Sequence, residues 1–428
     1  MLEFTPQASQ FGNSVVGDPP MDLLIRAGRG DHLLVKDLCA PAASGLWPLR
    51  ELPLTGVVAD AQVAVERPGL RETADAAGVP FLVDPLTPLL ADQQSPSNGW
   101  ARLPYATADK LTPADLGHHE LQDELIDQVI GFQREQGATV LIPPYVYVDR
   151  RNSAWLEVNR SLLIRTARYL EREDIDLPVA PVFAASLHQF GPQSTWAAGL
   201  DPFLATADEM NTRYVALSMS WSKQRAASYD AIATLMTATQ HAAAGRRVLS
   251  WRQGLYGAAL TGVGAAGYET GPGHGEAGHY PQLLARKRPS DKPRTGGGEA
   301  NVYFTAFGRS LDRSHGQKLL ENRLLRATLV CPESSCCPDG ASSMINSWRE
   351  HAVRARQREL AEIDRMPASP SWRLNKISRD AEQAALSTRA ANDVLAEAGN
   401  GWRLPTDTYR HLSDVAADIR ANLGRRVA

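Results

Sequence analysis

Residues 246–271 read RRVLSWRQGLYGAALTGVGAAGYETG and hold two short apolar runs on either side of a stretch rich in Gly and Ala. The runs RVLSW, from Arg247, and AGYETG, from Ala266, are too short for helices and predict strands. The stretch 254–264 between them is expected to be helical. Strand, helix and strand in this order are typical of parallel strands joined by a crossover helix.

The same alternation extends outward over about 300 residues, with helical patterns at 121–135, 152–173 and 228–244. The apolar runs are nearly continuous, which indicates parallel strands covered on both faces. The other predicted strands are DLLIRA (from Asp22), GVVADA (from Gly56), PFLVDP (from Pro80), TVLIPP (from Thr139), PVAPVFA (from Pro178), RYVALSMS (from Arg213) and VYFTAF (from Val302).

This pattern predicts an α/β fold, a (β/α)8 TIM-type barrel over residues 21–330. An N-terminal extension, 1–20, would precede it, and a Cys/His segment with C-terminal helices, 331–428, would follow. A doubly wound open sheet is the alternative fold. Because no GxGxxG follows the first strand, dinucleotide binding is not indicated.

Composition excludes several classes of protein. The 428 residues carry a net charge of −3 and are 43% hydrophobic, which excludes a disordered or strongly polybasic chain. No apolar run approaches the ~20 residues that span a bilayer, and MLEFTPQASQFGNS lacks the features of a signal peptide. Four cysteines are too few for a disulfide-framed secreted fold. We therefore expect a cytoplasmic protein without membrane association.

Polar residues at the ends of the predicted strands form the first candidate site. In a barrel these ends converge on one mouth, where paired carboxylates can act as nucleophile and general acid/base at an anomeric carbon. An Asp after a strand is also a common turn residue or helix N-cap, so each acid alone has a purely structural interpretation. The candidates are Asp60, Asp84, Asp149 and Glu269, with Arg252, Ser218 and Ser220 as further ligand contacts.

A second candidate site lies in the sequence CPESSCC. Three of the four cysteines, Cys331, Cys336 and Cys337, fall within seven residues, and His351 follows on a predicted helix. Three thiolates and an imidazole complete a tetrahedral zinc site, which would leave no open position and would be structural. The structural alternative is a loop of free cysteines beside an unrelated histidine.

A third feature is a Gly/Pro-rich basic loop. Five cations lie within nine residues of it and could hold phosphate groups, although an ordinary solvated loop is equally consistent. They are Arg286, Lys287, Arg288, Lys292 and Arg294.

The order of these features resembles the tRNA-guanine transglycosylase family: a strand ending in Asp84, residues 246–271 ending in GYETG, YFTAFGRSLDRSHG, the Cys cluster and a helical His351. The resemblance implies a zinc-containing TIM barrel that exchanges a base in a nucleic acid for a 7-deazapurine such as 7-deazaguanine. It also implies that Glu269 is the nucleophile, Asp84 the general acid/base and Asp149 a base-recognising carboxylate. The chain resembles a distant member of the family, such as the transglycosylase-like proteins linked to DNA base modification.

Three functions follow as hypotheses. The first is a transglycosylase-like transferase acting on a base of DNA or tRNA that is flipped out of any duplex. The second is a carboxylate-dependent glycoside hydrolase, which also uses two carboxyl groups. The third is a non-catalytic barrel whose amphipathic tail, 378–428, binds a second copy of the chain or another protein.

Overall fold

The computed structural model describes residues 20–44, 52–91, 99–149, 153–186, 193–220, 227–273, 276, 278–281, 283, 301–397, 399 and 401–427. Its centre is an eight-stranded sheet in which all neighbouring strands are parallel, in the order β3-β2-β1-β8-β7-β6-β5-β4. The strands are β1 (Asp22–Ala27), β2 (Gly56–Asp60), β3 (Phe81–Asp84), β4 (Tyr147–Val148), β5 (Val182–Ser186), β6 (Val215–Ser220), β7 (Val248–Ser250) and β8 (Gly267–Thr270).

Two isolated bridges join the ends of this sheet. Leu82 in β3 pairs in parallel with Val140, and Leu141 pairs with Val179, just before β5. The Thr139 N–H donates to the Phe81 carbonyl at 2.9 Å, and the Ala180 N–H donates to the Leu141 carbonyl at 2.8 Å. The run predicted from Thr139 therefore closes the ring with few pairs, and regular β4 begins only at Tyr147. This confirms the TIM-type α/β prediction.

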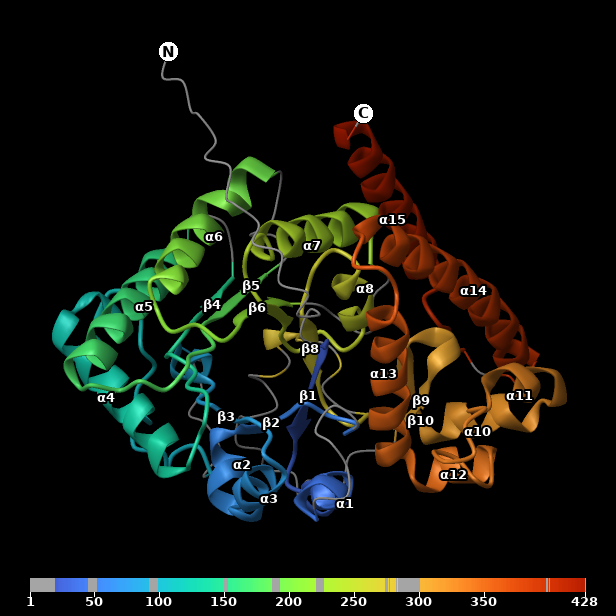
Figure 1. Cartoon of the computed structure of the whole chain (residues 1–428), viewed down its shortest axis with the longest axis horizontal. Coiled ribbons are helices and arrows are strands. Elements are labelled where there is room, and N and C mark those ends of the chain that lie inside the picture. The colour runs from blue at the N-terminus through green and yellow to red at the C-terminus, as the bar shows by residue number, and fades with distance from the viewer. Residues whose placement is uncertain are drawn as a thin grey trace.

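Helices cover the outside of the ring (Figure 1), and apolar side chains of the strands pack against them. At α8 this packing is close, because a Cβ on Gly257 would lie 2.2 Å from the ring of Tyr268 in β8. The helices are α1 (His32–Ala43), α2 (Ala61–Glu66), α3 (Gly69–Ala77), α4 (His119–Glu135), α5 (Trp155–Arg172), α6 (Gln193–Asp208), α7 (Tyr229–Ala242) and α8 (Gly257–Thr261), with short 3-10 turns η2 (Thr87–Ala91) and η3 (Asp115–Gly117).

The C-terminal part of the chain forms a separate layer beside the barrel, drawn in orange and red in Figure 1. It begins with the antiparallel hairpin β9–β10, and α13 contacts both β1 and α8 of the barrel. Helices α14 and α15 pack along each other. The elements are β9 (Asn301–Phe304), η4 (Thr305–Phe307), β10 (Arg309–Asp312), α10 (Arg313–Glu321), α11 (Arg323–Leu329), α12 (Ala341–Asn346), α13 (Trp348–Asp364), α14 (Pro370–Glu397) and α15 (Thr406–Val427).

Two features of this layer differ from the prediction. The run from Val302 belongs to β9, which pairs with β10 and not with the eight-stranded sheet. Its side chains pack with the cysteine segment and α14, so 301–329 contributes to the C-terminal layer. Helix α14 begins at Pro370, eight residues before the start of the tail predicted over 378–428, and proline is well accommodated in the first turn of a helix. Among the described residues, no helix is both long and apolar enough to cross a membrane.

Candidate functional sites

The alternation of side chains along the strands determines which residues point into the barrel. Leu24, Val58 and Leu82 pack together inside the ring, whereas their sequence neighbours face the outer helices. Since side chains alternate with a period of two, the residues two positions further on also point inward. These are Arg26, Asp60 and Asp84, at the carboxyl ends of β1, β2 and β3.

Arg26 lies at the centre of a buried cluster of charges. Its Nε and Nη2 donate to Oε1 and Oε2 of Glu269 at 2.7 and 3.1 Å. Its Nη1 lies 2.6 Å from Asp60 Oδ1 and 2.9 Å from Asp84 Oδ2. Glu269 and Asp84 are fully buried and are separated by the width of one guanidinium group. The predicted pair therefore does converge at the barrel mouth.

Arg252, two residues after β7, is the second cation of the cluster. Its Nη2 lies 3.0 Å from Asp60 and 3.2 Å from Asp84, and its backbone N–H donates to Glu269 Oε2 at 2.9 Å. Its φ of 55° lies in the left-handed region, which costs a non-glycine residue about 1 kcal/mol or more. This strained backbone directs both the N–H and the guanidinium of Arg252 toward the carboxylates.

The carboxylates differ in how fully they are bound. Asp84 has four polar contacts, three of them hydrogen bonds: Arg252 donates to Oδ2, the Leu86 N–H and Tyr145 O–H donate to Oδ1 at 2.9 and 3.0 Å, and Arg26 forms an ion pair with Oδ2. Burial, with the Asp84 charge as a second cause, raises the pKa of Tyr145 well above its usual value, so this hydroxyl remains a donor. Among the described residues, Glu269 Oε1 in contrast accepts one hydrogen bond, the one from Arg26.

Asp60 ends β2 and is the N-cap of α2, where the structural interpretation expects a capping bond. Its side chain makes no such bond and instead binds the two arginines. Three carboxylates and two guanidinium groups leave one net negative charge in this buried space. A buried charge without a partner is costly. Removing any one of these five groups would therefore leave its partners unpaired and destabilise the whole cluster.

Aromatic rings form the wall beside these charges. Trp251 is fully buried, its ring centre lies 4.9 Å from the Arg26 guanidinium carbon, and its Nε1 has no hydrogen-bond partner in the part of the chain that the structure describes. Tyr147 and Tyr280 stack with ring centroids 4.9 Å apart. The mouth thus combines ionised groups with flat apolar surfaces.

The remaining residues predicted to contact a ligand lie outside the charge cluster around Arg26. Ser218 and Ser220 alternate along β6 with residues that face outward, so both point into the barrel. Ser218 is fully buried, and Ser220 Oγ accepts a hydrogen bond from the Tyr280 N–H at 3.2 Å. Asp149 is exposed and accepts from Ser153 Oγ at 3.3 Å, near the start of α5, so it is not part of the charge cluster. The basic residues of 286–294 lie outside the described residues.

Sequence reasoning missed Arg26 and Tyr145. The signal for Arg26 was available, because it is a lone cation at an inward position of the apolar run DLLIRA. A buried arginine there requires several carboxylates, and the two next strands each end in one.

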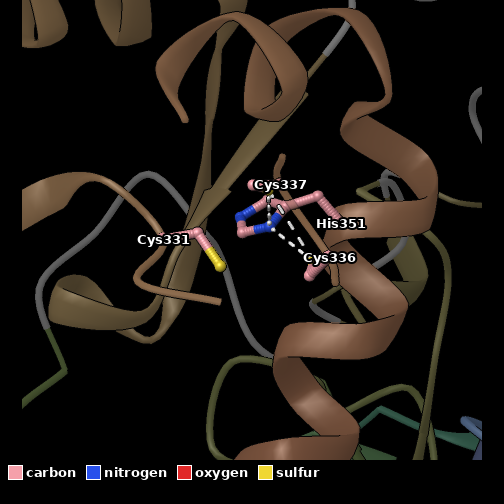
Figure 2. Close-up of side chains that lie close together, drawn as sticks. All are labelled: Cys331, Cys336, Cys337 and His351. Carbon is pink, nitrogen blue, oxygen red and sulfur yellow. Dashed lines mark hydrogen bonds between the residues drawn. The ribbon is translucent and has the colours of Figure 1, made fainter. Parts of the chain in front are cut away.

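The second site is the cysteine cluster (Figure 2). The ligand atoms of Cys331, Cys336, Cys337 and His351 all lie within 4.8 Å of one another, and all four residues are buried. His351 Nδ1 lies 3.5 and 3.4 Å from the sulfurs of Cys336 and Cys337, and these two sulfurs are 3.8 Å apart. The predicted four residues therefore come together as a group that could hold a metal ion.

The surroundings of this cluster favour metal binding. His351 Nε2 donates to the Tyr303 carbonyl at 2.9 Å, which leaves the lone pair of Nδ1 directed at the sulfurs. Hydrogen bonds from Cys336 and Cys337 lower the pKa of Cys331 far below its usual value, and Arg358 donates to the same sulfur at 3.7 Å. Metal ligation requires thiolates, and these contacts stabilise the thiolate of Cys331, whereas the bonds to Cys331 and Cys336 raise the pKa of Cys337.

Comparison with known proteins does not assign a family. No family model matches the chain, and no curated protein matches it. It is similar to the carboxyl transferase domain of Rhizobium etli pyruvate carboxylase with pyruvate (11% identity, TM-score 0.36, covering 95% of this chain and 62% of that one). It is also similar to a mutant of Thermobaculum terrenum O-GlcNAc hydrolase (13%, 0.34, 93% and 94%) and to a candidate phosphonomutase from Burkholderia cenocepacia J2315 (13%, 0.31, 63% and 90%).

Proposed function

We propose that the barrel mouth is the active site of a transglycosylase-like enzyme, which exchanges a nucleobase in a nucleic acid for a 7-deazapurine. The observation that carries the proposal is the convergence of Glu269 and Asp84 on the single guanidinium of Arg26. Two carboxylates held this close at the carboxyl end of a barrel suit displacement at an anomeric carbon.

In the proposed reaction Glu269 Oε1, which has a lone pair to spare, attacks the anomeric carbon. The bond from that carbon to the departing base breaks, and the base leaves with a proton. The incoming base then displaces Glu269 and gives up a proton, so the exchange is balanced. Arg26 binds both oxygens of Glu269 and holds them in place, and the buried Trp251 ring packs against the Arg26 guanidinium.

Asp84 is assigned the proton transfers. It has four polar contacts, three hydrogen bonds and one ion pair, so one must be released before a proton can reach it. The contact with Arg252 Nη2, at 3.2 Å, is the longest of the four. The proposal therefore includes a small shift of Arg252 when substrate enters.

Zinc is the ion we assign to the cysteine cluster. Typical Zn–S and Zn–N bonds of about 2.3 and 2.0–2.1 Å give tetrahedral edges of roughly 3.8 Å between sulfurs and 3.6 Å between sulfur and nitrogen. The observed 3.8 Å and 3.4–3.5 Å among Cys336, Cys337 and His351 agree with these edges, and the Cys331 sulfur lies within 4.8 Å of the other three ligand atoms. Four protein ligands leave no open position, so zinc would hold β9, α13 and the cysteine segment together and take no part in the exchange.

The polymer would be held by charges outside the barrel. The segment 286–294 follows β8, which carries Glu269, and its five cations would contact the phosphates of DNA or tRNA. The base would leave the stack to reach Arg26 and its partners inside the ring, at a cost of a few kcal/mol.

The test is incorporation of radiolabelled 7-deazaguanine into nucleic acid by purified protein. The wild type and a matched surface control, Glu157→Gln on α5, should incorporate label. Glu269→Gln should abolish incorporation with metal content unchanged, and Asp84→Asn should slow it by roughly 10²–10⁴-fold. Label incorporated equally by Glu269→Gln would contradict the assignment. Hydrolysis of aryl glycosides without nucleic acid would favour a glycoside hydrolase.

A further inference from the structure

The charge cluster at the barrel mouth is closed off from solvent. Glu269 and Asp84 are fully buried. Arg26, Asp60 and Arg252 are at most 9% exposed. Ligands of TIM-type barrels approach from the carboxyl ends of the strands, where this cluster lies. A ligand can therefore reach the carboxylates only if a group that covers them moves.

Tyr280 lies inside the barrel although it belongs to none of the eight strands. It stands ten residues after the end of β8, yet it is fully buried in the interior cluster with Leu249 and Trp251. Its backbone N–H donates to the hydroxyl of Ser220, the last residue of β6. The interior of such a barrel is normally filled by side chains of the strands. Tyr280 is thus inserted from the following segment, at the carboxyl end of the barrel.

The ring of Tyr280 occupies a flat space beside the charge cluster. It stacks on Tyr147 with ring centroids 4.9 Å apart and planes inclined by 12°. Burial raises the pKa of Tyr280 to about 12, the nearby Arg252 charge opposes this, and the Asp84 charge adds to it. The phenol is therefore near both signs of charge in the cluster. It stands where an aromatic ligand with a polar edge would stand.

A close approach by Gly278 holds this segment over the mouth. A Cβ at Gly278 would lie 3.1 Å from both the Cβ and the carbonyl oxygen of Arg252, and 3.2 Å from Ser218 Oγ. A side chain here would press on the backbone of Arg252, so the approach requires glycine. The covering position of Tyr280 consequently depends on the absence of a side chain two residues earlier.

Glu276 is the fixed point of the segment. Its buried carboxylate accepts from the N–H and Oγ of Ser310 at 3.1 and 2.6 Å and pairs with Arg356. Its carbonyl accepts from the Leu255 N–H at 3.0 Å. These contacts tie residue 276 to both the barrel and the C-terminal layer. A movement of Tyr280 would therefore begin after Glu276, and the glycine at 278 provides the backbone freedom for it.

We propose that Tyr280 is a plug: it occupies the position of a planar ring at the barrel mouth, and a substrate ring enters when residues 278–281 swing away from Arg252 and Ser220. The entering ring would stack on Tyr147 in place of the phenol and meet Asp84. That this ring is a nucleobase rests on the function proposed above, whereas the plug itself does not. In the closed state the plug keeps water away from the carboxylates.

The test uses the full-length protein and phenol, which has the ring and hydroxyl that Tyr280→Ala removes. Ligand-observed NMR should give a phenol Kd at least about tenfold lower for this variant than for the wild type, which must first open. Cyclohexanol carries the same hydroxyl on a ring that is not flat, and should bind the variant at least about tenfold more weakly than phenol. No gain in phenol binding, or equal binding of the two alcohols, would overturn the proposal.

Gly278→Val tests the movement while Tyr280 remains in place. The added side chain should push the segment away from Arg252, so phenol should bind about threefold or more tightly than to the wild type. The matched control is Gly131→Val on α4, where an added Cβ meets nothing within 4 Å, and it should bind phenol as the wild type does. Equal binding by Gly278→Val and the wild type would show that Tyr280 is a fixed part of the core, and would refute the plug.

Incorporation of 7-deazaguanine separates this proposal from the proposed function. In Tyr280→Ala, phenol should inhibit incorporation in competition with 7-deazaguanine, because both rings need the vacated space. Incorporation that continues while phenol is bound would overturn the plug and leave the proposed function intact. Phenol binding as expected, without incorporation by any variant, would support the plug and contradict the transglycosylase function.

Discussion

At the scale of single residues, Arg26 organises the barrel mouth. One guanidinium binds carboxylates from three different strands, which a lysine ammonium could not do with the same planar fork. Asp84 and Glu269 could be predicted from sequence because they end apolar runs. The lone cation inside DLLIRA marks Arg26 as a buried charge, but the carboxylates that it binds follow only from the strand order that makes β2, β3 and β8 neighbours of β1 or its pairs.

Arg26→Met should therefore destabilise the protein strongly. It leaves buried carboxylates without their main partner, a change that typically costs about 3–5 kcal/mol. Urea unfolding should show this loss at pH 7. The control is Arg29→Met, which breaks a half-exposed pair with Glu66 and should cost no more than about 1 kcal/mol. Similar losses in both variants would show that the cluster does not stabilise the barrel.

At the scale of elements, the sequence predicted strands best where an apolar run is followed by a helix. The run from Val302 has the same composition but is followed by η4 and a tight return at Gly308, whose φ of 57° suits glycine. It therefore forms a hairpin instead of a barrel strand. The cysteine segment was predictable because three ligands are local in sequence, and only His351 had to be supplied by α13.

Loss of the metal should act on these same elements. The double variant Cys336→Ser/Cys337→Ser should contain no zinc and should unfold at lower denaturant concentration, because metal binding there is part of the folding free energy. Elemental analysis and urea unfolding provide the two measurements. Cys39→Ala, which changes a buried cysteine in α1, should keep one equivalent of zinc. Wild-type protein without metal, or a double variant of unchanged stability, would refute the zinc site.

At the scale of the whole molecule, the net charge of −3 means that nucleic acid would be attracted by a local patch and not by the protein as a whole. Replacing the five cations of 286–294 with Gln should weaken oligonucleotide binding and lower the salt dependence by about one unit per lost phosphate contact. Fluorescence anisotropy at several salt concentrations measures both. The melting temperature should stay unchanged in this variant. Unchanged oligonucleotide binding would show that these five residues do not contact the nucleic acid.

The position of β1 between β2 and β8 also governs the order in which the chain can be assembled during synthesis. Arg26 and Glu269 are 243 residues apart, so one edge of β1 stays without its partner until nearly two thirds of the chain has left the ribosome. A parallel pairing over this distance forms slowly, and an apolar strand edge left open in the meantime is prone to join other chains. Nascent chains that stop before residue 267 should consequently depend on chaperones, because the strand that would cover this edge has not yet been made.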